Sequence, residues 1–453
     1  MEDLTVNDLI LTPVFLAVFY AIAVAIRSSV TNVYTRKYFL PALTLKFIGA
    51  IALGLIYKFY YGGGDTFNYY AHARGIYQGF GKSFAVGLQL LFHAPSNPET
   101  APFIANLFWY DAPSEYFVGQ VGAVCALLCL NTYMVIALMF ACISFSGIWA
   151  MFVTFVKIRP HVYTQLAAAC FFVPSLFFWG SGLMKDSLCI GALGWLFYGF
   201  YRGAIQKQRL LFSTIMAGIG AYVLYTTKIY ILLSFLPPAL LWVFNENSQR
   251  IRSAALRMLA RPLLIGVGAA LGLFAMTRLT EGNEKYDIDK IGEQSKLTAD
   301  YLYQTSIKQQ GSAYSLGEQD GSIGGMVKLA PQAIVVALFR PFPWEARSPI
   351  MMLSSLEALF FLGFTVRIML RSGVLATLKT IASTPVLSLC FIFSLVFAAS
   401  VGIISYNFGT LVRYKMPLIP FYVGGLYILQ SISLDKRPAA KTARRPVARR
   451  LAA

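Results

Sequence analysis

The charged residues that could do chemistry in this sequence stand inside or beside long apolar segments. An unpaired charge there costs several kcal/mol, so each such residue needs a partner or a function. The first is Asp65, which follows three glycines at 62–64 and has tyrosines on both sides. Two interpretations are open: Asp65 caps the helix after the glycines, or it is the base of a lipid-facing active site.

The second group is Lys185 and Asp186, which follow the glycines and serine at 180–182 between two apolar runs. Such small residues indicate unwound backbone that lines a polar cavity. Asp186 could instead cap the next helix. A cation at a helix start opposes the helix dipole, so we expect Lys185 to meet an anion.

Three further groups complete the set. Arg340 and Glu345 bracket two prolines and a tryptophan, and form either a salt bridge that stiffens a turn or part of a ligand site. Arg413 and Lys415 precede the last apolar run, where an anionic headgroup or phosphate would explain them; snorkelling to the interface is the alternative. Lys228, between tyrosines at 225 and 230, is a weaker member of this set.

Glu357 lies inside the apolar run 353–362 and should face protein, with a partner that the sequence does not identify. Together, the remaining residues place one acid, Asp65, opposite three or four cations. This pattern suits a reaction on a phosphate-linked lipid, because cations stabilise the departing phosphate while a carboxylate takes a proton from an attacking hydroxyl. The sequence has no nucleotide-binding motif, which favours a lipid-phosphate donor over a nucleotide donor.

Composition defines the scaffold that must position these residues. Of the 453 residues, 57% are hydrophobic and 13% charged, whereas soluble domains carry roughly 25% charged residues. Many continuous apolar runs approach the roughly 17–25 residues that span hydrocarbon, and they do not alternate as strands of a barrel do. The sequence therefore predicts an all-α polytopic integral membrane protein.

The remaining composition excludes several site classes. The formal charge of +18 lies mostly in candidate loops and in the tail, which indicates topology and no nucleic acid partner. The six cysteines lie in apolar runs and the three histidines are scattered, so we expect no haem or zinc site and no cofactor, with an optional divalent metal as the open alternative.

Twelve apolar runs are candidate spans, and the positive-inside rule fits best when eleven of them cross the membrane and residues 117–130 form a half-helix. If all twelve cross, the orientation of one half of the chain is inverted relative to this rule. The runs are residues 9–26, 40–57, 117–130, 133–156, 165–179, 188–201, 210–225, 229–244, 263–276, 350–366, 386–404 and 416–432.

We expect one transmembrane domain over residues 1–434 and a disordered, basic cytoplasmic tail over 435–453. The long external loops are predicted at 62–116 and 277–349, with an external turn at 406–415. Within the loops, residues 84–92 and 331–343 read as interfacial helices. Residues 277–327 hold eight of the twenty acids and read as a polar, partly ordered lid.

Four short elements resemble polytopic membrane proteins of bacterial polysaccharide gene clusters, which are similar to GT-C glycosyltransferases and cell-surface polysaccharide polymerases. The elements are GGGD at 62–65, PSLFFWGSGLMKDS at 174–187, FRPFPWE at 339–345 and RYKMPLIPF at 413–421. The resemblance implies a GT-C-like scaffold in the bacterial inner membrane and a polyprenyl-phosphate-linked sugar donor. It also implies Asp65 as base and Lys185, Arg413 and Lys415 as ligands of the lipid phosphate. The chain departs from the pattern because Asp65 follows the second apparent helix and no large soluble C-terminal domain is present.

Three functions follow as hypotheses. The first is a membrane glycosyltransferase in cell-surface polysaccharide or glycolipid synthesis, in which Asp65 deprotonates the acceptor and the 277–327 loop covers it. The second is a polymerase or ligase that joins lipid-linked oligosaccharides without a dedicated base. The third is a transporter or flippase of a lipid-linked or anionic solute, which predicts an internal repeat that is not evident. The expected partners are a polyprenyl-phosphate-linked sugar or oligosaccharide and membrane lipid.

Overall fold

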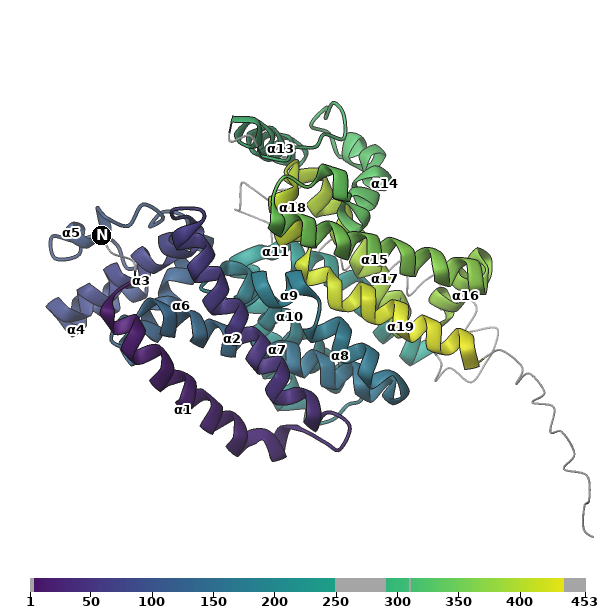
Figure 1. The fold of residues 1–453 in the computed structure, drawn as a ribbon, viewed down its shortest axis with the longest axis horizontal. Helices are drawn as coiled ribbons and strands as arrows, with labels where there is room; N and C mark the ends of the chain where they lie inside the picture. The colour runs from purple at the N-terminus through teal and green to yellow at the C-terminus, as the bar shows by residue number, and fades with distance from the viewer. Residues whose placement is uncertain (1–3, 249–290, 309–310, 436–453) are drawn as a thin grey trace, which may run out of the picture.

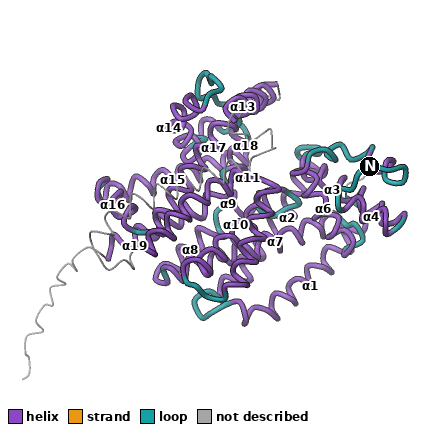
Figure 2. The backbone as a smooth tube through the Cα atoms, turned by 180° about the vertical axis from the view of Figure 1, so that it is seen from behind, coloured by secondary structure: helices purple, strands orange, loops and turns teal. Residues whose placement is uncertain are grey.

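The computed structural model describes residues 4–248, 291–308 and 311–435. These residues form helices joined by loops, with no strand among them (Figures 1 and 2). Eight helices within the described residues are long and apolar enough to cross a membrane. The protein is therefore a multi-pass α-helical membrane protein, as predicted. The eight are α1 (Val6–Val30), α2 (Arg36–Phe59), α7 (Tyr133–Ile158), α10 (Lys185–Phe200) continued by η2 (Tyr201–Ile205), α11 (Leu210–Ser248), α15 (Pro349–Ser372), α17 (Pro385–Ser405), and α18 (Phe408–Tyr414) with η4 (Met416–Leu418) and α19 (Ile419–Asp435).

Shorter helices connect and cover these spans. They are α3 (Asp65–Lys82), α4 (Phe84–Leu91), α5 (Ala101–Ile104), α6 (Pro113–Leu128), η1 (Pro160–Val162), α8 (Tyr163–Phe171), α9 (Pro174–Trp179), α13 (Ile291–Lys308), α14 (Ile323–Phe339), η3 (Pro343–Glu345) and α16 (Val374–Ser383). Helix α4 matches the short helix predicted over residues 84–92.

The predicted number of eleven spans is not found among the described residues, and each difference has a local cause. The candidate run 263–276 lies outside the described residues. Helix α6 has 16 residues, which is about 24 Å and too short for a hydrocarbon core of about 30 Å, in keeping with the predicted half-helix. The predicted span over residues 165–179 is not one continuous helix. It divides into α8 and α9, because Pro174 lacks an N–H and begins a new helix.

Helix α11 contains two of the predicted spans, because its chain reverses direction at Lys228. The backbone there is not helical, with φ −141° and ψ 76°. Residues from both ends of α11 lie beside the C-terminal end of α10. A Cβ atom on Gly199 would lie 2.4 Å from the carbonyl oxygen of Ser213, and the Phe200 ring centroid is 6.0 Å from that of Trp242. The two halves of α11 therefore run along α10 in opposite directions.

Two predicted loops contain helices. Residues 291–308 of the polar segment form α13, whose buried residues Ser295 and Ala299 lie one turn apart on one face, whereas residues 311–322 are loop, as predicted. The predicted turn at 406–415 contains α18, which begins where the Asn407 side chain accepts a hydrogen bond from the Thr410 amide. Residues 277–290 and the tail from 436 lie outside the described residues. Helix α14 begins eight residues before the interfacial helix predicted at 331–343.

Helices α7 and α10 form the centre of the molecule and approach each other at glycines. A Cβ atom on Gly147 would lie 1.8 Å from the Gly191 carbonyl oxygen, and one on Gly194 would lie 2.0 Å from the Gly147 carbonyl oxygen. Only glycine allows this contact, which is typical of packed membrane helices. Helix α10 is consequently buried along most of its length.

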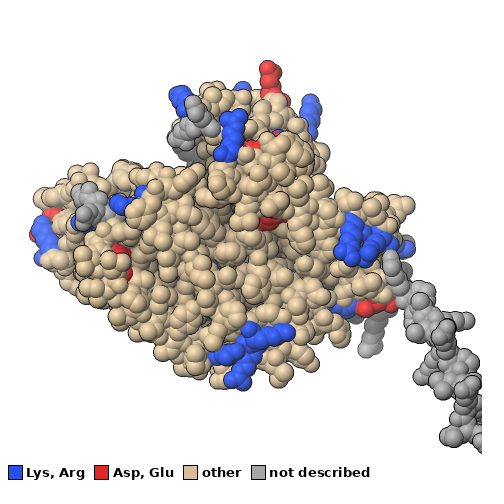
Figure 3. Space-filling model, viewed as in Figure 1, with Lys and Arg blue, Asp and Glu red and all other residues tan. Residues whose placement is uncertain are grey.

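Basic side chains lie in several groups on the surface, and one of these groups marks the end of the bundle at which α1 and α2 meet (Figure 3). Figure 3 shows Lys and Arg at its lower edge, over the turn between α1 and α2, where Arg36 and Lys37 are exposed. Lys157 at the end of α7 donates to Gln206 at 2.7 Å, which places the ends of α7 and α10 together. Tyr38 at the start of α2 donates to Thr164 near the start of α8, at 3.2 Å. The start of α10 and the end of α2 therefore lie at the opposite end of the bundle.

Candidate functional site

The glycines at 62–64 bring Asp65 to this opposite end of the bundle. All three have positive φ, at 71°, 139° and 127°, which L residues rarely adopt. A Cβ atom on Gly64 would lie 2.8 Å from the Tyr57 ring, so the loop packs directly on α2. The glycines end α2 as predicted, but the capping interpretation of Asp65 is wrong. Gly64 is the N-cap of α3, and the Asp65 carboxylate reaches across to Arg413.

Four charged residues from four helices form one network, which we call the Asp65–Lys228 network. Nη1 of Arg413 lies 2.5 Å from Oδ2 of Asp65, and its Nε donates to Oδ2 of Asp186. The other oxygen of Asp186 accepts from Nζ of Lys228 at 2.5 Å. These residues stand on α3, α18, α10 and α11, so the network joins distant parts of the chain. Its two acids and two cations cancel in formal charge.

Burial differs sharply across the network. The Asp186 side chain is 1% exposed, whereas that of Asp65 is 43% exposed. Lys228 lies 4.3 Å from the centre of the Tyr414 ring, a cation–π contact. The capping interpretation of Asp186 is wrong, because Met184 is the N-cap of α10 and the carboxylate is occupied by two cations. Asp186 is the buried centre of the network, and Asp65 is its accessible member.

Lys185 meets an anion, as predicted, and the anion is Glu115. Nζ of Lys185 lies 2.5 Å from Oε1 of Glu115 and 3.0 Å from Oγ of Ser114. Sequence reasoning missed Glu115. The available signal was an acid two residues after Pro113 and just before an apolar run, the usual place for an acid in the first turn of a helix.

Arg340, Glu345 and Lys415 lie apart from the Asp65–Lys228 network. Arg340 pairs with Glu345, whose Oε2 also accepts the amide of Phe342 at 2.7 Å, so the predicted salt bridge in a turn is present. Burial raises the pKa of Glu345, but the hydrogen bonds from Arg340 and Phe342 outweigh it and lower the pKa overall. Lys415 is 1% exposed and donates to the Arg340 carbonyl at 3.2 Å, so the snorkelling interpretation is wrong for it. Arg413 does not snorkel either, because it is held by two carboxylates.

Two further buried charges support the broken segment before α10. Glu357 accepts from the amide of Ser175 at 3.1 Å and from its hydroxyl at 2.7 Å, which supplies the partner that the sequence left open. Lys46 of α2 is 1% exposed and donates to the Gly180 carbonyl at 2.7 Å and to Oγ of Ser144 at 3.0 Å. Sequence reasoning missed Lys46, although a lone lysine inside the apolar run 40–57 was the signal.

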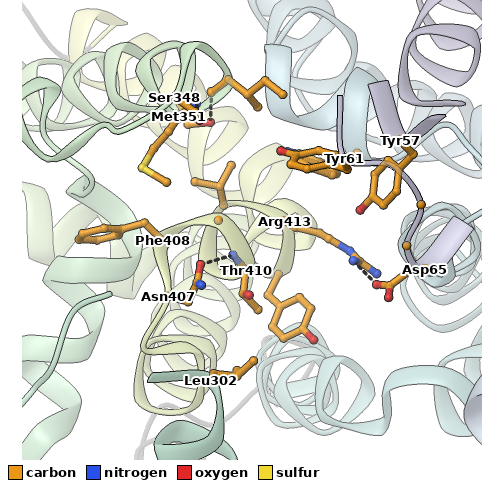
Figure 4. A pocket seen from close by; sticks show the side chains of 18 residues that line it. Tyr57, Tyr61, Asp65, Leu302, Ser348, Met351, Asn407, Phe408, Thr410 and Arg413 are labelled. Atoms are coloured by element: carbon orange, nitrogen blue, oxygen red, sulfur yellow. Dashed lines mark hydrogen bonds and ion pairs between the residues drawn. The ribbon is translucent and has the colours of Figure 1, made fainter. Parts of the chain in front are cut away.

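Two cavities flank the network. The first, of about 620 Å³, is lined by Asp65, Arg413 and the tyrosines at 57 and 61 (Figure 4). The second, of about 360 Å³, is lined by Lys185 and Lys228 together with Glu115. Tyr414 borders both. We expected the charges to converge on one pocket, and they are instead divided between two cavities that share a wall.

Four of the predicted site residues line neither of these two cavities: Asp186, Arg340, Glu345 and Lys415. Within the described ranges, no cluster of three or more His, Cys, Asp and Glu side chains is placed to hold a metal ion. Compared with protein-family models, with curated proteins and with solved structures, the chain matches none of them. Its function must therefore be argued from the site itself.

Proposed function

We propose that this protein is a GT-C-like membrane glycosyltransferase that uses a polyprenyl-phosphate-linked sugar donor in cell-surface polysaccharide or glycolipid synthesis. The observation that carries the proposal is the Asp65–Lys228 network. It joins one partly exposed carboxylate to three buried charges beside two cavities. A transfer from a phosphate-linked lipid needs both a proton acceptor and cations close together.

The charge distribution supports an external site. Positive loops of membrane proteins face the cytoplasm, and the exposed Arg36 and Lys37 stand at the end of the bundle opposite the network. We therefore assign the network to the outer face of a bacterial inner membrane. Nucleotide-linked sugars are absent there, and a lipid-linked donor is the matching chemistry.

In the proposed reaction, Asp65 accepts the proton of the acceptor hydroxyl. The hydroxyl oxygen then forms a bond to the anomeric carbon of the donor sugar. The bond between that carbon and the phosphate oxygen breaks, and its electron pair leaves with the lipid phosphate. Asp65 suits the role of base because it is the one carboxylate of the network with a substantially exposed side chain.

Arg413 couples this proton transfer to stabilisation of the leaving phosphate. Before reaction, its guanidinium is shared between Asp65 and Asp186. When Asp65 takes the proton, it becomes neutral and its attraction for Arg413 falls. The network then carries one net positive charge at the moment when negative charge develops on the leaving phosphate. Asp186 still holds Nε of Arg413, so the guanidinium keeps its position.

A transfer assay with the purified protein in lipid vesicles tests this proposal. A polyprenyl-phosphate-linked radiolabelled sugar serves as donor, and labelled product is measured for the wild type, Asp65→Asn and Arg413→Gln. We expect both variants to lose transfer. Full activity of Asp65→Asn would remove Asp65 as the base.

A polysaccharide polymerase or ligase is the second candidate function. The observation that favours it is the ion pair that occupies Oδ2 of Asp65, since a reaction without a dedicated base would leave this pair intact. In that case Asp65→Asn retains activity while Arg413→Gln does not. The two-variant comparison therefore separates the candidates.

Broken helices favour a third candidate, a transporter or flippase. The interruption between α8 and α9 and the reversal at Lys228 resemble the discontinuous helices of transporters. Transport would appear as movement of labelled lipid-linked sugar across the vesicle membrane without a change in its chemical identity. A transferase instead changes the labelled species and leaves its sidedness unaltered.

A further inference from the structure

We propose that the second cavity binds the phosphate and the first isoprene unit of the donor, while the first cavity receives the acceptor. The two substrates would then reach the network from opposite sides of Tyr414. This inference rests on the proposed function and assigns its donor to the cavity next to Lys185 and Lys228.

The polar part of the second cavity fits a phosphate. Lys185 and Lys228 both line it, and Ser114 and Thr227 add hydroxyl groups. Lysine ammonium groups and hydroxyls are ordinary partners of phosphate oxygens. Lys185 already holds one carboxylate, that of Glu115. A phosphate in this cavity would share Lys185 with that carboxylate and would also contact Lys228.

The apolar part of the same cavity fits an isoprenoid chain. It is formed by Leu233 and Pro237 of the second half of α11, by Val396 and Ile404 of α17, and by Met326 of α14. Both α11 and α17 are long and apolar enough to cross a membrane, so this wall is built largely by helices that contact lipid chains. A soluble sugar acceptor would gain nothing from such a wall.

The first cavity has a different character. Next to Asp65 and Arg413 it presents the backbone of the glycine loop, the amide side chain of Asn407 and the hydroxyls of Ser348 and Thr410. Figure 4 shows these polar groups around the same opening. They can hydrogen-bond the hydroxyls of a sugar, and Asp65 lies among them.

The size of the second cavity limits what it can hold. Its volume of about 360 Å³ corresponds to roughly twelve water molecules at ~30 Å³ each. A phosphate group and one isoprene unit together have a similar number of heavy atoms. The rest of a polyprenyl chain must therefore extend out of the cavity into the membrane.

The shared wall explains how two separate substrates could react. Asp186 pairs with Arg413, which lines the first cavity, and with Lys228, which lines the second. Tyr414 borders both cavities. A phosphate on the Lys228 side would put the bond to its sugar at this border. Asp65 would then meet the acceptor hydroxyl from the other side.

Site-specific photocrosslinking tests the placement of the donor. The photoreactive residue p-benzoyl-phenylalanine is introduced at Val396 in the second cavity, at Met351 in the first, and at exposed Val14 on α1 as a control. Each variant of the full chain is reconstituted in vesicles with a fluorescent polyprenyl phosphate. We expect labelling at position 396 to exceed that at 14 and 351 by about tenfold, a difference of about 1.4 kcal/mol in binding. Excess unlabelled polyprenyl phosphate should compete it away.

A pair of charge variants sharpens this test. Lys185→Gln should reduce labelling at position 396 by about tenfold, because it removes one charge-assisted contact with the phosphate. Lys379→Gln, an exposed lysine on α16, should leave labelling unchanged. If Lys185→Gln fails to fold, the comparison of the three crosslinking positions in the wild-type background still decides.

The outcomes separate the inference from the function beneath it. Stronger competed labelling at 351 than at 396 would overturn the donor placement and leave the proposed transferase intact. Equal labelling at all three positions, without competition, would mean that no polyprenyl phosphate site exists at the network. That result would overturn both the placement and the proposed function.

Discussion

Replacing Asp65 with asparagine should abolish transfer without destabilising the protein. The substitution keeps the shape of the side chain and removes its ability to accept a proton. The Asp65 side chain is 43% exposed, and ion pairs of exposed groups contribute about 0–1 kcal/mol to stability. Arg413 remains held by Asp186. We therefore expect the free energy of unfolding to change by less than about 1 kcal/mol.

The expected loss of rate is much larger than this change in stability. A positioned general base contributes roughly 10²–10⁴-fold to the rate, which is about 2.7–5.4 kcal/mol at 1.36 kcal/mol per tenfold. Asparagine also resembles protonated aspartate in charge and leaves the cations of the network with one fewer anion. The KM for the lipid-linked donor should therefore stay equal or fall, while kcat falls by at least about 100-fold.

The assay compares initial transfer rates and thermal unfolding of the same vesicle preparations. Asp111→Asn, which alters an exposed acid in the loop before α6, is the matched control and should change neither quantity. A rate for Asp65→Asn within about threefold of wild type would refute the role of Asp65, since no general base contributes so little. A large fall in the unfolding temperature of Asp65→Asn would contradict the conclusion that the exposed Asp65 side chain contributes little to stability.

Three further predictions concern the supporting structure. Asp186→Asn should lower the free energy of unfolding by about 3–5 kcal/mol, because the substitution leaves buried Lys228 and Arg413 without their shared anion. Chemical denaturation of the variant and the wild type measures this difference. A difference below about 1 kcal/mol would contradict the prediction. Gly64→Ala should reduce transfer, because its Cβ would meet the Tyr57 ring at a φ of 127°; unchanged transfer would contradict the tight loop. Burial lowers the pKa of His72 from 6.5 to about 4 in the folded protein. Between pH 6.5 and 4 the unfolded chain therefore binds more protons than the folded protein. The free energy of unfolding consequently falls as the pH drops, by up to about 3 kcal/mol. In unfolding measurements from pH 7 to 4, His72→Gln should remove this loss, and an identical pH profile for the variant would contradict it.

The sequence could identify the charged residues of the site but not their pairing. Asp65, Asp186, Lys228 and Arg413 were recognisable because each is an isolated charge next to an apolar run. Their contacts join residues as far apart as 348 positions in the chain. No periodicity or spacing predicts which of several candidate cations faces which acid. The division of the charges into two cavities depends on the same three-dimensional packing.

The helices were predicted where apolar runs were continuous, and missed where polarity concealed them. The spans α1, α2, α7 and α17 follow from hydropathy alone. Helix α13 buries only one narrow face, so its polar composition resembled a loop. At Pro174 the chain breaks into two helices, because other groups, including Glu357, satisfy the backbone that the break exposes.

The most direct test is a structure of the protein in a lipid nanodisc with bound polyprenyl phosphate. The phosphate oxygens should lie about 2.7–3 Å from the ammonium groups of Lys185 and Lys228, with the Asp65 carboxylate facing them across Arg413. A phosphate bound at the basic end near the α1–α2 turn, with nothing beside Arg413, would contradict the account.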